Sequence, residues 1–413
     1  MRRQRRLEDL AENLPWVGEL LERSISATKA ALRDMFEPTA FFEALGVHYL
    51  GPFDGHDIAE IEDALRNAAE FDGPVVVHVL TQKGRGHAPA EQDPIKHMHD
   101  TGGVKVGSYT AAFTESILKA AESRPEVVAI TAAMPDSTGL LPFRDRFPDR
   151  CFDVGIAEQH AVTAAAGMAM GGLRPVVALY ATFLSRAFDQ ANLDVGLHGL
   201  PVVFCLDRAG ITGDDGPSHH GVLDMVLLSK IPGMTILAPS SYQELQQMFE
   251  DALAITDGPV AIRWAKTPAP HVGWDEVGRG LSARQVRVAS DDRTVCLLGA
   301  GKMLAAAVEA ADLLAADGIH ATVWDPRCIR PLDETMLDDA AAHRLVVTVE
   351  DGFREGGFGT GVLDDLSSRS PRTEVAVLGV PVAHHAHGKV DDLLASFGLD
   401  GPGIAATVLK RLG

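Results

Sequence analysis

The chain has 413 residues, of which 46% are hydrophobic and 23% are charged. These values are typical of a globular protein, and the length predicts two or three domains. Acidic side chains outnumber basic ones by 57 to 37, which gives a net charge of −20 and argues against a general nucleic-acid-binding surface. A few local arginines can still bind an anionic substrate in such a protein.

The N-terminal segment begins with MRRQRR, which carries the charge of a signal-peptide start. The segment that follows, LEDLAENLPWVGELL, is interrupted by acids and a proline, so it lacks the apolar core of a signal peptide. No apolar run reaches the roughly 18 residues of a membrane span. We therefore expect a pair of surface helices here and a cytoplasmic protein with no membrane partner.

The cysteines show no paired spacing and no metal-ligand spacing among themselves. Three of the four lie in or beside apolar runs, which favours reduced thiols over a disulfide framework. The four residues are Cys151, Cys205, Cys296 and Cys328.

Residues 41–86 predict a β-α-β unit. FFEALGVHYLGPFDGHD (41–57) reads as a short helix, a strand and a glycine-rich loop, and IAEIEDALRNAAEF is an amphipathic helix. GPVVVHVLTQKGRG then predicts a second strand that ends in a basic loop. Two strands cannot cover both faces of a sheet, so we expect only part of a domain here. The polar, glycine-rich stretch 88–108 is interpreted as a crossing linker.

A second domain is predicted from about residue 109 to 270. The apolar runs VVAIT, PVVALY, PVVFCLD, MTILAPS and PVAIRW alternate with helical segments, a pattern that indicates a doubly wound parallel sheet. Ligands of such sheets bind beyond the carboxyl ends of the strands. Those ends carry the polar stretches MPDSTG, YATFLSR, DRAGITGDDGPSHHG and RWAK, so a site is expected there.

A third α/β domain is predicted to follow an acidic linker (271–292) and to run to the C-terminus. It begins with a strand, a helix and a strand, and RLVVTVEDG and TEVAVLGV are further strands. The GAGKML turn lacks the full dinucleotide-binding fingerprint, and no acid follows at the right place to hold a ribose. A tight strand-to-helix turn is therefore the better interpretation.

The stretch 151–190 predicts a loop, a helix, a strand and a second helix, with Glu158 at the start of the first helix. That helix consists almost wholly of small residues, which allow a close helix pair or a subunit contact. A carboxylate among apolar residues is costly to bury, which favours a functional Glu158. The alternative is an acid that only complements the helix dipole.

The loop 207–221 is rich in acids, glycine and histidine and follows a buried strand. His219 or His220 could carry a proton near neutral pH, although a solvated loop would show the same composition. Four cations near the strand ends could converge as an anion clamp, and each alone could equally be a surface charge. These cations are Arg186, Arg208, Arg263 and Lys266.

Several ordered motifs together resemble one family. They are DVGIAEQHAV, YATFLSRAFDQ, DRAGITGDDGPSHHG, IPGM and EDGFREGGFG, joined by FEALGVHYLGPFDGHD and KGRGHAPAEQDPI. The family is the 1-deoxy-D-xylulose-5-phosphate synthases, which are thiamine-diphosphate enzymes of the transketolase superfamily, and the likeness covers about residues 36–413.

This resemblance implies a transketolase-like α/β fold. Residues 105–270 would form the pyrimidine-binding domain, 285–413 the C-terminal domain, and 1–104 a remnant of the diphosphate-binding domain with a linker. The family joins pyruvate and glyceraldehyde 3-phosphate with loss of carbon dioxide, in isoprenoid-precursor, thiamine and pyridoxal biosynthesis. It uses thiamine diphosphate and magnesium.

The resemblance also assigns residues to the cofactor. Glu158 matches the catalytic glutamate that hydrogen-bonds the aminopyrimidine ring, and Phe183 matches the ring that stacks on it. His87 stands where the family usually has a tyrosine in KGRGY, and it is a further cofactor-binding candidate.

Other matching positions surround the substrate in that family. His219 resembles the catalytic, substrate-facing histidine, and Arg208 resembles the phosphate ligand. Lys266 replaces the second arginine of the family's phosphate grip, because RYPRG is RWAKT here; a lysine keeps the charge but loses the bidentate fork. The substrate-binding candidates are Tyr180, Arg186, Arg208, Asp215 and Lys266.

The sequence contains no GDG triplet, the motif that in the family holds magnesium and the diphosphate together with a distant asparagine. We therefore assign no metal ligand to this chain and expect one half of a divided enzyme. The expected assembly is a homodimer or a heteromer with a chain that carries the GDG motif. The alternatives are a non-catalytic or regulatory relative, another thiamine-diphosphate carboligase, or a beta-like subunit of a 2-oxo-acid dehydrogenase.

Overall fold

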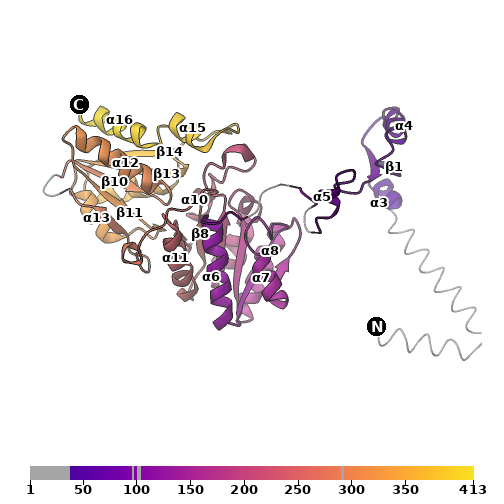
Figure 1. Cartoon of the computed structure of the whole chain (residues 1–413), viewed down its shortest axis with the longest axis horizontal. Coiled ribbons are helices and arrows are strands. Elements are labelled where there is room, and N and C mark those ends of the chain that lie inside the picture. The colour runs from indigo at the N-terminus through magenta and orange to yellow at the C-terminus, as the bar shows by residue number, and fades with distance from the viewer. Residues whose placement is uncertain (1–37, 95–96, 100–103, 290–292) are drawn as a thin grey trace, which may run out of the picture. The chain divides into compact units, whose positions relative to one another are not determined.

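The computed structural model describes residues 38–94, 97–99, 104–289 and 293–413 (Figure 1). The chain divides into two compact units, Met1–Thr101 and Gly102–Gly413, and each is described by itself. The pair of helices expected near the N-terminus lies outside the described residues.

The first unit contains the predicted β-α-β unit. Strands β1 (His48–Asp54) and β2 (Val75–Leu80) pair in parallel, and α4 (Ile58–Ala68) joins them, with the Asp57 carboxylate accepting bonds from two backbone N–H groups of its first turn. Every residue of both strands is partly or fully exposed. Helix α3 (Pro38–Ala44) precedes this unit, and the short α5 (Ala88–Glu91) falls within the stretch interpreted as a linker.

The second unit begins with a seven-stranded sheet of order β12-β7-β8-β6-β5-β3-β4. All neighbours pair in parallel except β12 and β7. The five predicted strands are confirmed, and the sheet gains the three-residue edge strands β4 and β12, of which the antiparallel β12 makes it mixed. The strands are β3 (Val127–Thr131), β4 (Cys151–Asp153), β5 (Arg174–Tyr180), β6 (Val203–Asp207), β7 (Thr235–Leu237), β8 (Val260–Arg263) and β12 (Cys328–Arg330).

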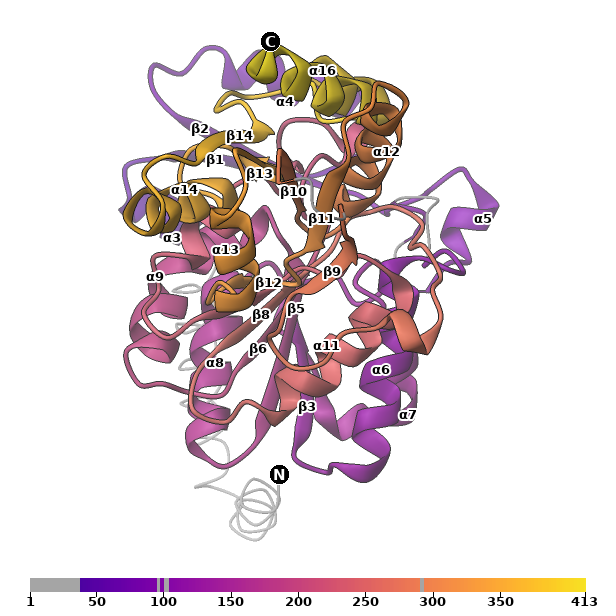
Figure 2. The ribbon, with the colours of Figure 1, turned by 90° about the vertical axis from the view of Figure 1, so that its left-hand side faces the viewer.

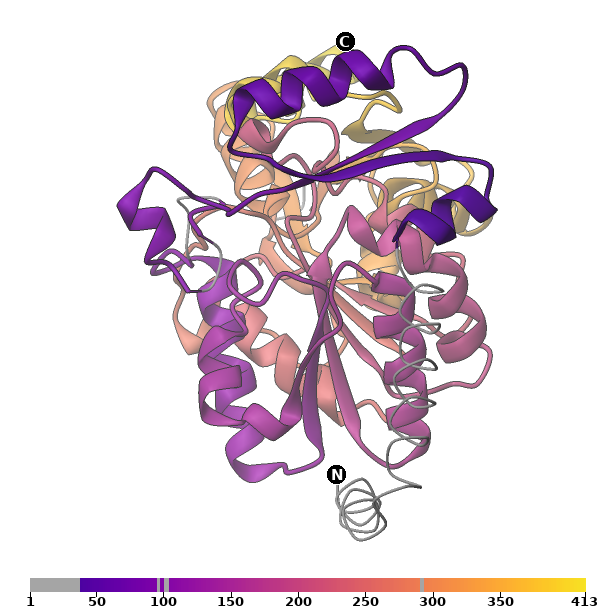
Figure 3. The same cartoon turned by 90° about the vertical axis from the view of Figure 1, so that its right-hand side faces the viewer.

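Helices cover both faces of this sheet (Figures 2 and 3). One face packs against α6 (Tyr109–Ser123), α7 (Leu141–Arg146) and α11 (Tyr242–Ala254) in one hydrophobic cluster. The other face packs against α8 (Glu158–Met170) and α10 (Asp224–Leu228). A doubly wound arrangement was predicted, and it is confirmed.

The second helix expected after β5 is not a regular α-helix. The chain instead forms a short 3-10 helix, a single turn of α-helix and a short π-helix in succession. These are η2 (Phe183–Ala187), α9 (Phe188–Gln190) and η3 (Ala191–Gly196); the tight turns η1 (Pro148–Arg150) and η4 (Gly213–Asp215) lie elsewhere.

The C-terminal part forms a five-stranded sheet of order β14-β13-β10-β11-β9, in which the edge strand β9 alone is antiparallel. Its strands are β9 (Arg284–Arg287), β10 (Val295–Gly299), β11 (Ala321–Asp325), β13 (Leu345–Phe353) and β14 (Glu374–Val380). Strand β9 lies inside the stretch interpreted as a linker. The helical elements are η5 (Trp274–Glu276), α12 (Met303–Ala316), α13 (Glu334–Ala341), α14 (Phe358–Arg369), α15 (Val390–Ser396) and α16 (Gly401–Leu412).

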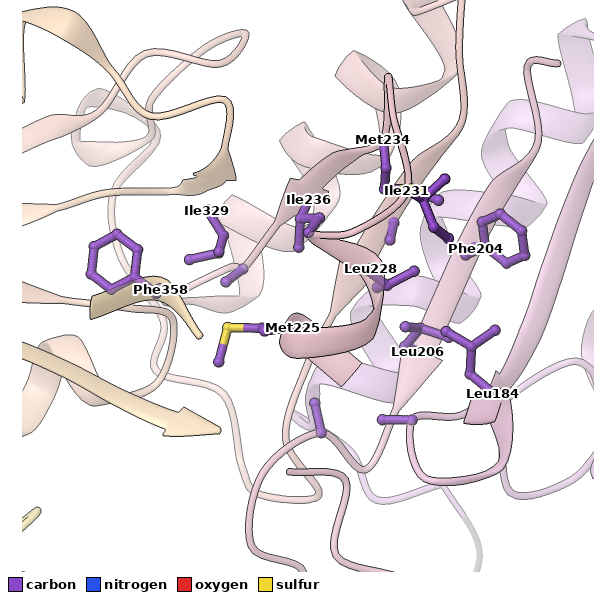
Figure 4. Packing of buried hydrophobic residues seen from close by; sticks show 14 of the residues in the cluster. Leu184, Phe204, Leu206, Met225, Leu228, Ile231, Met234, Ile236, Ile329 and Phe358 are labelled. Carbon is purple, nitrogen blue, oxygen red and sulfur yellow. The ribbon is translucent and has the colours of Figure 1, made fainter. Parts of the chain in front are cut away.

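One hydrophobic cluster continues from the seven-stranded sheet into the C-terminal part. Leu206, Met225 and Ile236 belong to the same cluster as Ile329 and Phe358 (Figure 4). Buried contact of this kind holds the two parts of the second unit together. In the part of the chain that the structure describes, no helix is long and apolar enough to span a membrane.

Candidate functional site

The carboxyl ends of three neighbouring parallel strands bring the predicted site residues to one edge of the sheet. Tyr180 ends β5 and pairs with Asp207 at the end of β6, and Leu206 pairs with Arg263 at the end of β8. Arg208 therefore leaves the sheet beside Tyr180. This is the edge at which ligands bind in open α/β sheets, as the sequence predicted.

Three rings meet at this edge. The Tyr180 and Phe183 rings are stacked with centroids 5.6 Å apart, and the His219 ring meets them edge-on at 6.3 Å and 5.4 Å respectively. The Ser218 hydroxyl lies 2.9 Å from Nδ1 of His219, so Ser218 helps to set the orientation of that ring. Three residues predicted from two separate stretches thus form one cluster.

Glu158 is the first residue of α8, where a carboxylate complements the helix dipole, and it is only 3% exposed. Its Oε1 lies 3.5 Å from Nη1 of the exposed Arg186. The Arg186 guanidinium in turn lies 5.5 Å from the centroid of the Phe183 ring. Arg186 therefore links the buried carboxylate to the ring cluster.

Arg208 is held on three sides. Its guanidinium lies 4.4 Å from the centroid of the Tyr180 ring, and its Nη1 lies 2.8 Å from Oδ2 of the buried Asp207 and donates to the Ser137 carbonyl at 2.5 Å. The buried Nε of Arg208 has no hydrogen-bond partner among the described residues. Arg208 adopts a φ of +60°, a conformation uncommon for residues other than glycine that often marks a functional site.

Burial shifts the pKa values of two groups beside Arg208, namely Tyr180 and Asp207. It raises the pKa of Tyr180, with the Arg208 charge opposing that rise, so the phenol stays neutral. Burial also raises the pKa of Asp207, against the lowering effects of Arg208 and of Thr110, whose hydroxyl donates to Oδ2 at 2.6 Å. Sequence reasoning did not single out Asp207 or Ser137, although both belong to polar stretches that it placed at strand ends.

Lys266 and Asp215 form a pair of their own. The Lys266 Nζ lies 2.7 Å from both carboxylate oxygens of Asp215. Lys266 is exposed, and Asp215 lies in η4 of the loop that carries His219. Arg208 and Lys266 thus each bind a carboxylate, and their joint grip on one phosphate remains a prediction.

The expectation that four cations form an anion clamp is wrong for Arg263. Arg263 is 3% exposed, and its Nε and Nη1 each donate over 2.7 Å to the buried carboxylates of Asp224 and Asp351. Because Asp351 belongs to the C-terminal part, this arginine joins the two parts of the second unit. It is not free to bind a substrate anion.

The two loop histidines have different surroundings. His220 is buried, and its Nδ1 accepts a bond of 3.1 Å from the Thr212 backbone N–H while Nε2 lies 3.4 Å from the Ala386 carbonyl. Burial lowers the pKa of His220, which keeps it neutral and structural. His219 is therefore the candidate proton carrier of the two.

A close approach of backbones closes this loop. Gly210 and Gly221 exchange two backbone hydrogen bonds of 2.8 Å. A Cβ atom at Gly221 would lie 2.3 Å from the Arg208 carbonyl oxygen and 2.7 Å from Cβ of Ala181, so a larger residue there would displace the backbone beside the site.

His87 belongs to the first unit, where it precedes α5 as its N-terminal flanking residue. Its expected role at the cofactor stays a prediction.

One group in the described part of the chain has metal-ligand chemistry, and it lies outside this site. Potential ligand atoms of Cys296, Asp339 and His343 lie within 4.8 Å of one another. The Asp339 carboxylate already accepts bonds from Arg293 and from Nε1 of Trp324, and His343 Nδ1 lies 2.8 Å from the Asp339 carbonyl. Burial also raises the pKa of the Cys296 thiol. These groups therefore serve packing.

Family models match most of the chain. The model "Transketolase, pyrimidine binding domain" matches residues 106–270 and "Transketolase, C-terminal domain" matches 284–404. The model "1-deoxy-D-xylulose-5-phosphate synthase" matches residues 2–81. A 1-deoxy-D-xylulose-5-phosphate synthase 1 of Kitasatospora griseola is 44% identical over 97% of this chain, and the synthase of Thermobifida fusca is 43% identical over 95% of it.

Nearly the whole chain is therefore similar to 1-deoxy-D-xylulose-5-phosphate synthases. It spans 63% of the length of these two curated synthases. The resemblance stated from the motifs and the transketolase-like fold are both confirmed.

Solved transketolase structures match three quarters of the chain. A protein described as "Split gene transketolase, inactive beta4 tetramer" matches with a TM-score of 0.65 and 28% identity, over 75% of this chain and 98% of that chain. A transketolase variant from Pichia stipitis matches with a TM-score of 0.62 over 75% of this chain and 46% of its own, at 16% identity, which shows the fold alone.

Proposed function

We propose that this chain supplies one half of a thiamine-diphosphate-dependent 1-deoxy-D-xylulose-5-phosphate synthase, which joins pyruvate to glyceraldehyde 3-phosphate and releases carbon dioxide. The observation that carries this proposal is the buried Glu158 at the start of α8, linked through Arg186 to the Phe183, Tyr180 and His219 rings. In this proposal residues 105–270 and 285–413 are the pyrimidine-binding and C-terminal domains. Residues 1–104 belong to the diphosphate-binding domain and its linker.

The residues present fit the pyrimidine end of the cofactor. A buried carboxyl group can exchange hydrogen bonds with an aminopyrimidine, and the half-buried Phe183 ring offers a face for stacking. When bound, thiamine diphosphate supplies a nucleophilic carbon that adds to the ketone of a 2-oxo acid. Glu158 would hold and move the proton at the pyrimidine, and His87 would contribute a further contact.

The remaining residues of the edge would act on the substrates. His219, oriented by Ser218, would move a proton at the reacting oxygen. Arg208 would bind the acceptor phosphate with its unpaired Nε–H, and Lys266 would assist after release from Asp215. Tyr180, Arg186 and Asp215 would line the substrate.

Magnesium and the diphosphate would be held by a GDG-bearing segment or chain, in a homodimer or a heteromer. The similarity to a split-gene transketolase supports that arrangement. Apolar side chains beside α8 and η3 are also strongly exposed, with Ile156 at 78%, Met170 at 61% and Leu197 at 73%. Such side chains suit a subunit contact. A cytoplasmic location remains a prediction.

The test is co-expression with a neighbouring reading frame that encodes GDG and the downstream asparagine. We expect the two chains to purify together, to bind thiamine diphosphate in a magnesium-dependent titration, and to form 1-deoxy-D-xylulose 5-phosphate. A stable complex that binds the cofactor but forms no product from these substrates would favour another carboligase or a 2-oxo-acid dehydrogenase subunit. A complex that binds no cofactor would favour a regulatory relative.

A further inference from the structure

A cavity of about 450 Å³ lies within the second unit, among α12, α15 and the segment that follows β8. Its walls include Pro268, Met303, Ala306 and Leu394, so most of its surface is apolar. The candidate site residues do not line it. Nothing in the proposed synthase activity uses this cavity.

Tyr109, the first residue of α6, lines the cavity and is 1% exposed. Its hydroxyl has no hydrogen-bond partner among the described residues. Burial raises the pKa of Tyr109 far above its ordinary value, so the hydroxyl keeps its proton and remains a donor. A buried donor without an acceptor is uncommon and unfavourable, so an acceptor atom that reached this hydroxyl from the cavity would be stabilised.

Lys302 supplies a second donor in the same cavity. It flanks the start of α12, a helix of 14 residues, where the free backbone N–H groups add partial positive charge. No hydrogen bond or ion pair of its side chain occurs within the described part of the chain. Burial lowers the pKa of Lys302, while Asp351 and Asp391 favour its charged form and Arg263 opposes it.

The acids of the cavity lie mainly at its other end. Glu309 lies seven residues after Lys302 on α12, about 10 Å further along the helix. Its carboxylate lies against Gly401, where an added Cβ would be 2.5 Å from its Cδ. Asp400 caps α16 by accepting a bond of 2.9 Å from the Gly403 N–H. Two of the three acids are therefore directed at the start of α16, and Asp391 remains closer to Lys302.

We propose that this cavity binds a small monocarboxylate with a short aliphatic body. The two carboxylate oxygens accept hydrogen bonds from the Tyr109 hydroxyl and the Lys302 ammonium, and the body packs on Pro268, Met303 and Leu394. The one ammonium of Lys302 can balance a single carboxylate charge, whereas a phosphate dianion would be repelled more strongly by the three acids. A cationic amine would leave both donors unpaired.

The test uses the full chain and ligand-observed NMR titrations with three probes: hexanoate, inorganic phosphate and hexylammonium. Three variants are compared with the unchanged protein, namely Tyr109→Phe, Lys302→Met and, as a matched control, Lys230→Met at an exposed lysine outside the cavity. We expect hexanoate to bind and each cavity variant to weaken it roughly tenfold or more, as for a lost hydrogen bond to a charged group. Lys230→Met should leave hexanoate binding unchanged.

Tyr109→Phe keeps the ring and removes only a hydroxyl that has no hydrogen-bond partner among the described residues, so this variant should fold normally, with an unchanged thermal midpoint. The proposal is overturned if hexanoate does not bind, or if it binds the two cavity variants as well as the unchanged protein. It is equally overturned if phosphate or hexylammonium shows the loss of binding in these variants that is expected for hexanoate.

Discussion

Glu158 is the residue on which the chemical proposal depends most. The structure buries its carboxyl group and places a single cation, Arg186, at 3.5 Å. In an assembled, active enzyme we expect Glu158→Ala to lower turnover by roughly 10²–10⁴-fold, the usual value of general acid–base help, and to leave the thermal midpoint nearly unchanged. Steady-state turnover with a parallel melting curve checks this, and near-normal turnover would remove Glu158 from its assigned role.

Arg208 is predicted to bind the phosphate of the acceptor substrate. In the proposed enzyme, Arg208→Ala should raise the Michaelis constant for glyceraldehyde 3-phosphate far more than that for pyruvate, because only the acceptor carries a phosphate. Kinetics with each substrate varied in turn measure this. Since Arg208 also neutralises the buried Asp207, Arg208→Lys serves as the control that retains the charge. Equal effects on both substrates would show that Arg208 does not bind the phosphate.

At Lys266, a substitution is expected to preserve or improve binding of the phosphorylated acceptor. Lys266→Arg restores a planar fork at the end of β8, which can bind a phosphate through two bonds. We expect this variant to retain activity and to lower, or leave unchanged, the Michaelis constant for the phosphorylated acceptor. A large rise in that constant would indicate that the Lys266–Asp215 pair has a role that arginine cannot fill.

At the scale of elements, Arg327 ties the start of the C-terminal part to α11. Its side chain is fully buried, with Nε donating to Glu244 at 2.8 Å and Nη1 to the Ser282 carbonyl at 2.7 Å. Arg327→Met should lower the free energy of unfolding by roughly 3–5 kcal/mol, because Glu244 is left as an unpaired buried charge.

Urea denaturation measures that loss against two references. The exposed pair Arg411–Glu374 provides the matched control, and Arg411→Met should cost at most about 1 kcal/mol. The double variant Arg327→Met, Glu244→Leu should recover part of the loss, since the unpaired charge is gone. Equal losses for Arg327→Met and Arg411→Met would contradict a structural role for the buried pair.

The contact between the 207–221 loop and residues 381–389, which includes His220 and the Ala386 carbonyl, should respond to pH through His220. Burial lowers its pKa, so the unfolded chain, with an ordinary histidine pKa of about 6.5, binds the proton more readily. The stability contributed by neutral His220 is therefore complete above about pH 6.5 and is lost as pH falls below it. His220→Gln should reduce the drop in urea midpoint between pH 7.5 and pH 5.5, and an equal drop in both proteins would refute this.

The sequence predicted the buried strands because long apolar runs such as PVVALY and PVVFCLD define them locally. It did not predict β4, β9 and β12, which have only three or four residues and exist because a neighbouring strand pairs with them. The same limit applied at the site. Arg263 and Arg208 look alike in sequence, but the partners of Arg263 lie 39 and 88 residues away, and only the fold reveals them.

At the scale of the whole molecule, the proposed cofactor site requires a second contributor. In the proposed enzyme, the contacts around Glu158 and Phe183 would concern only the pyrimidine end of thiamine diphosphate, which is a small part of the whole interaction. We therefore expect the isolated chain to bind thiamine diphosphate weakly or not at all. Calorimetry with and without magnesium tests this, and tight, magnesium-dependent binding by the pure chain would contradict it.

The most direct test of the central claim is carbon dioxide release from pyruvate labelled at C1. It would be measured for this chain alone, for the GDG-bearing partner alone, and for both together. We predict release only from the mixture, stimulated by glyceraldehyde 3-phosphate and abolished when this chain carries Glu158→Ala. Release at the same rate without this chain, or with its Glu158→Ala variant, would contradict the claim that this chain supplies half of the active site.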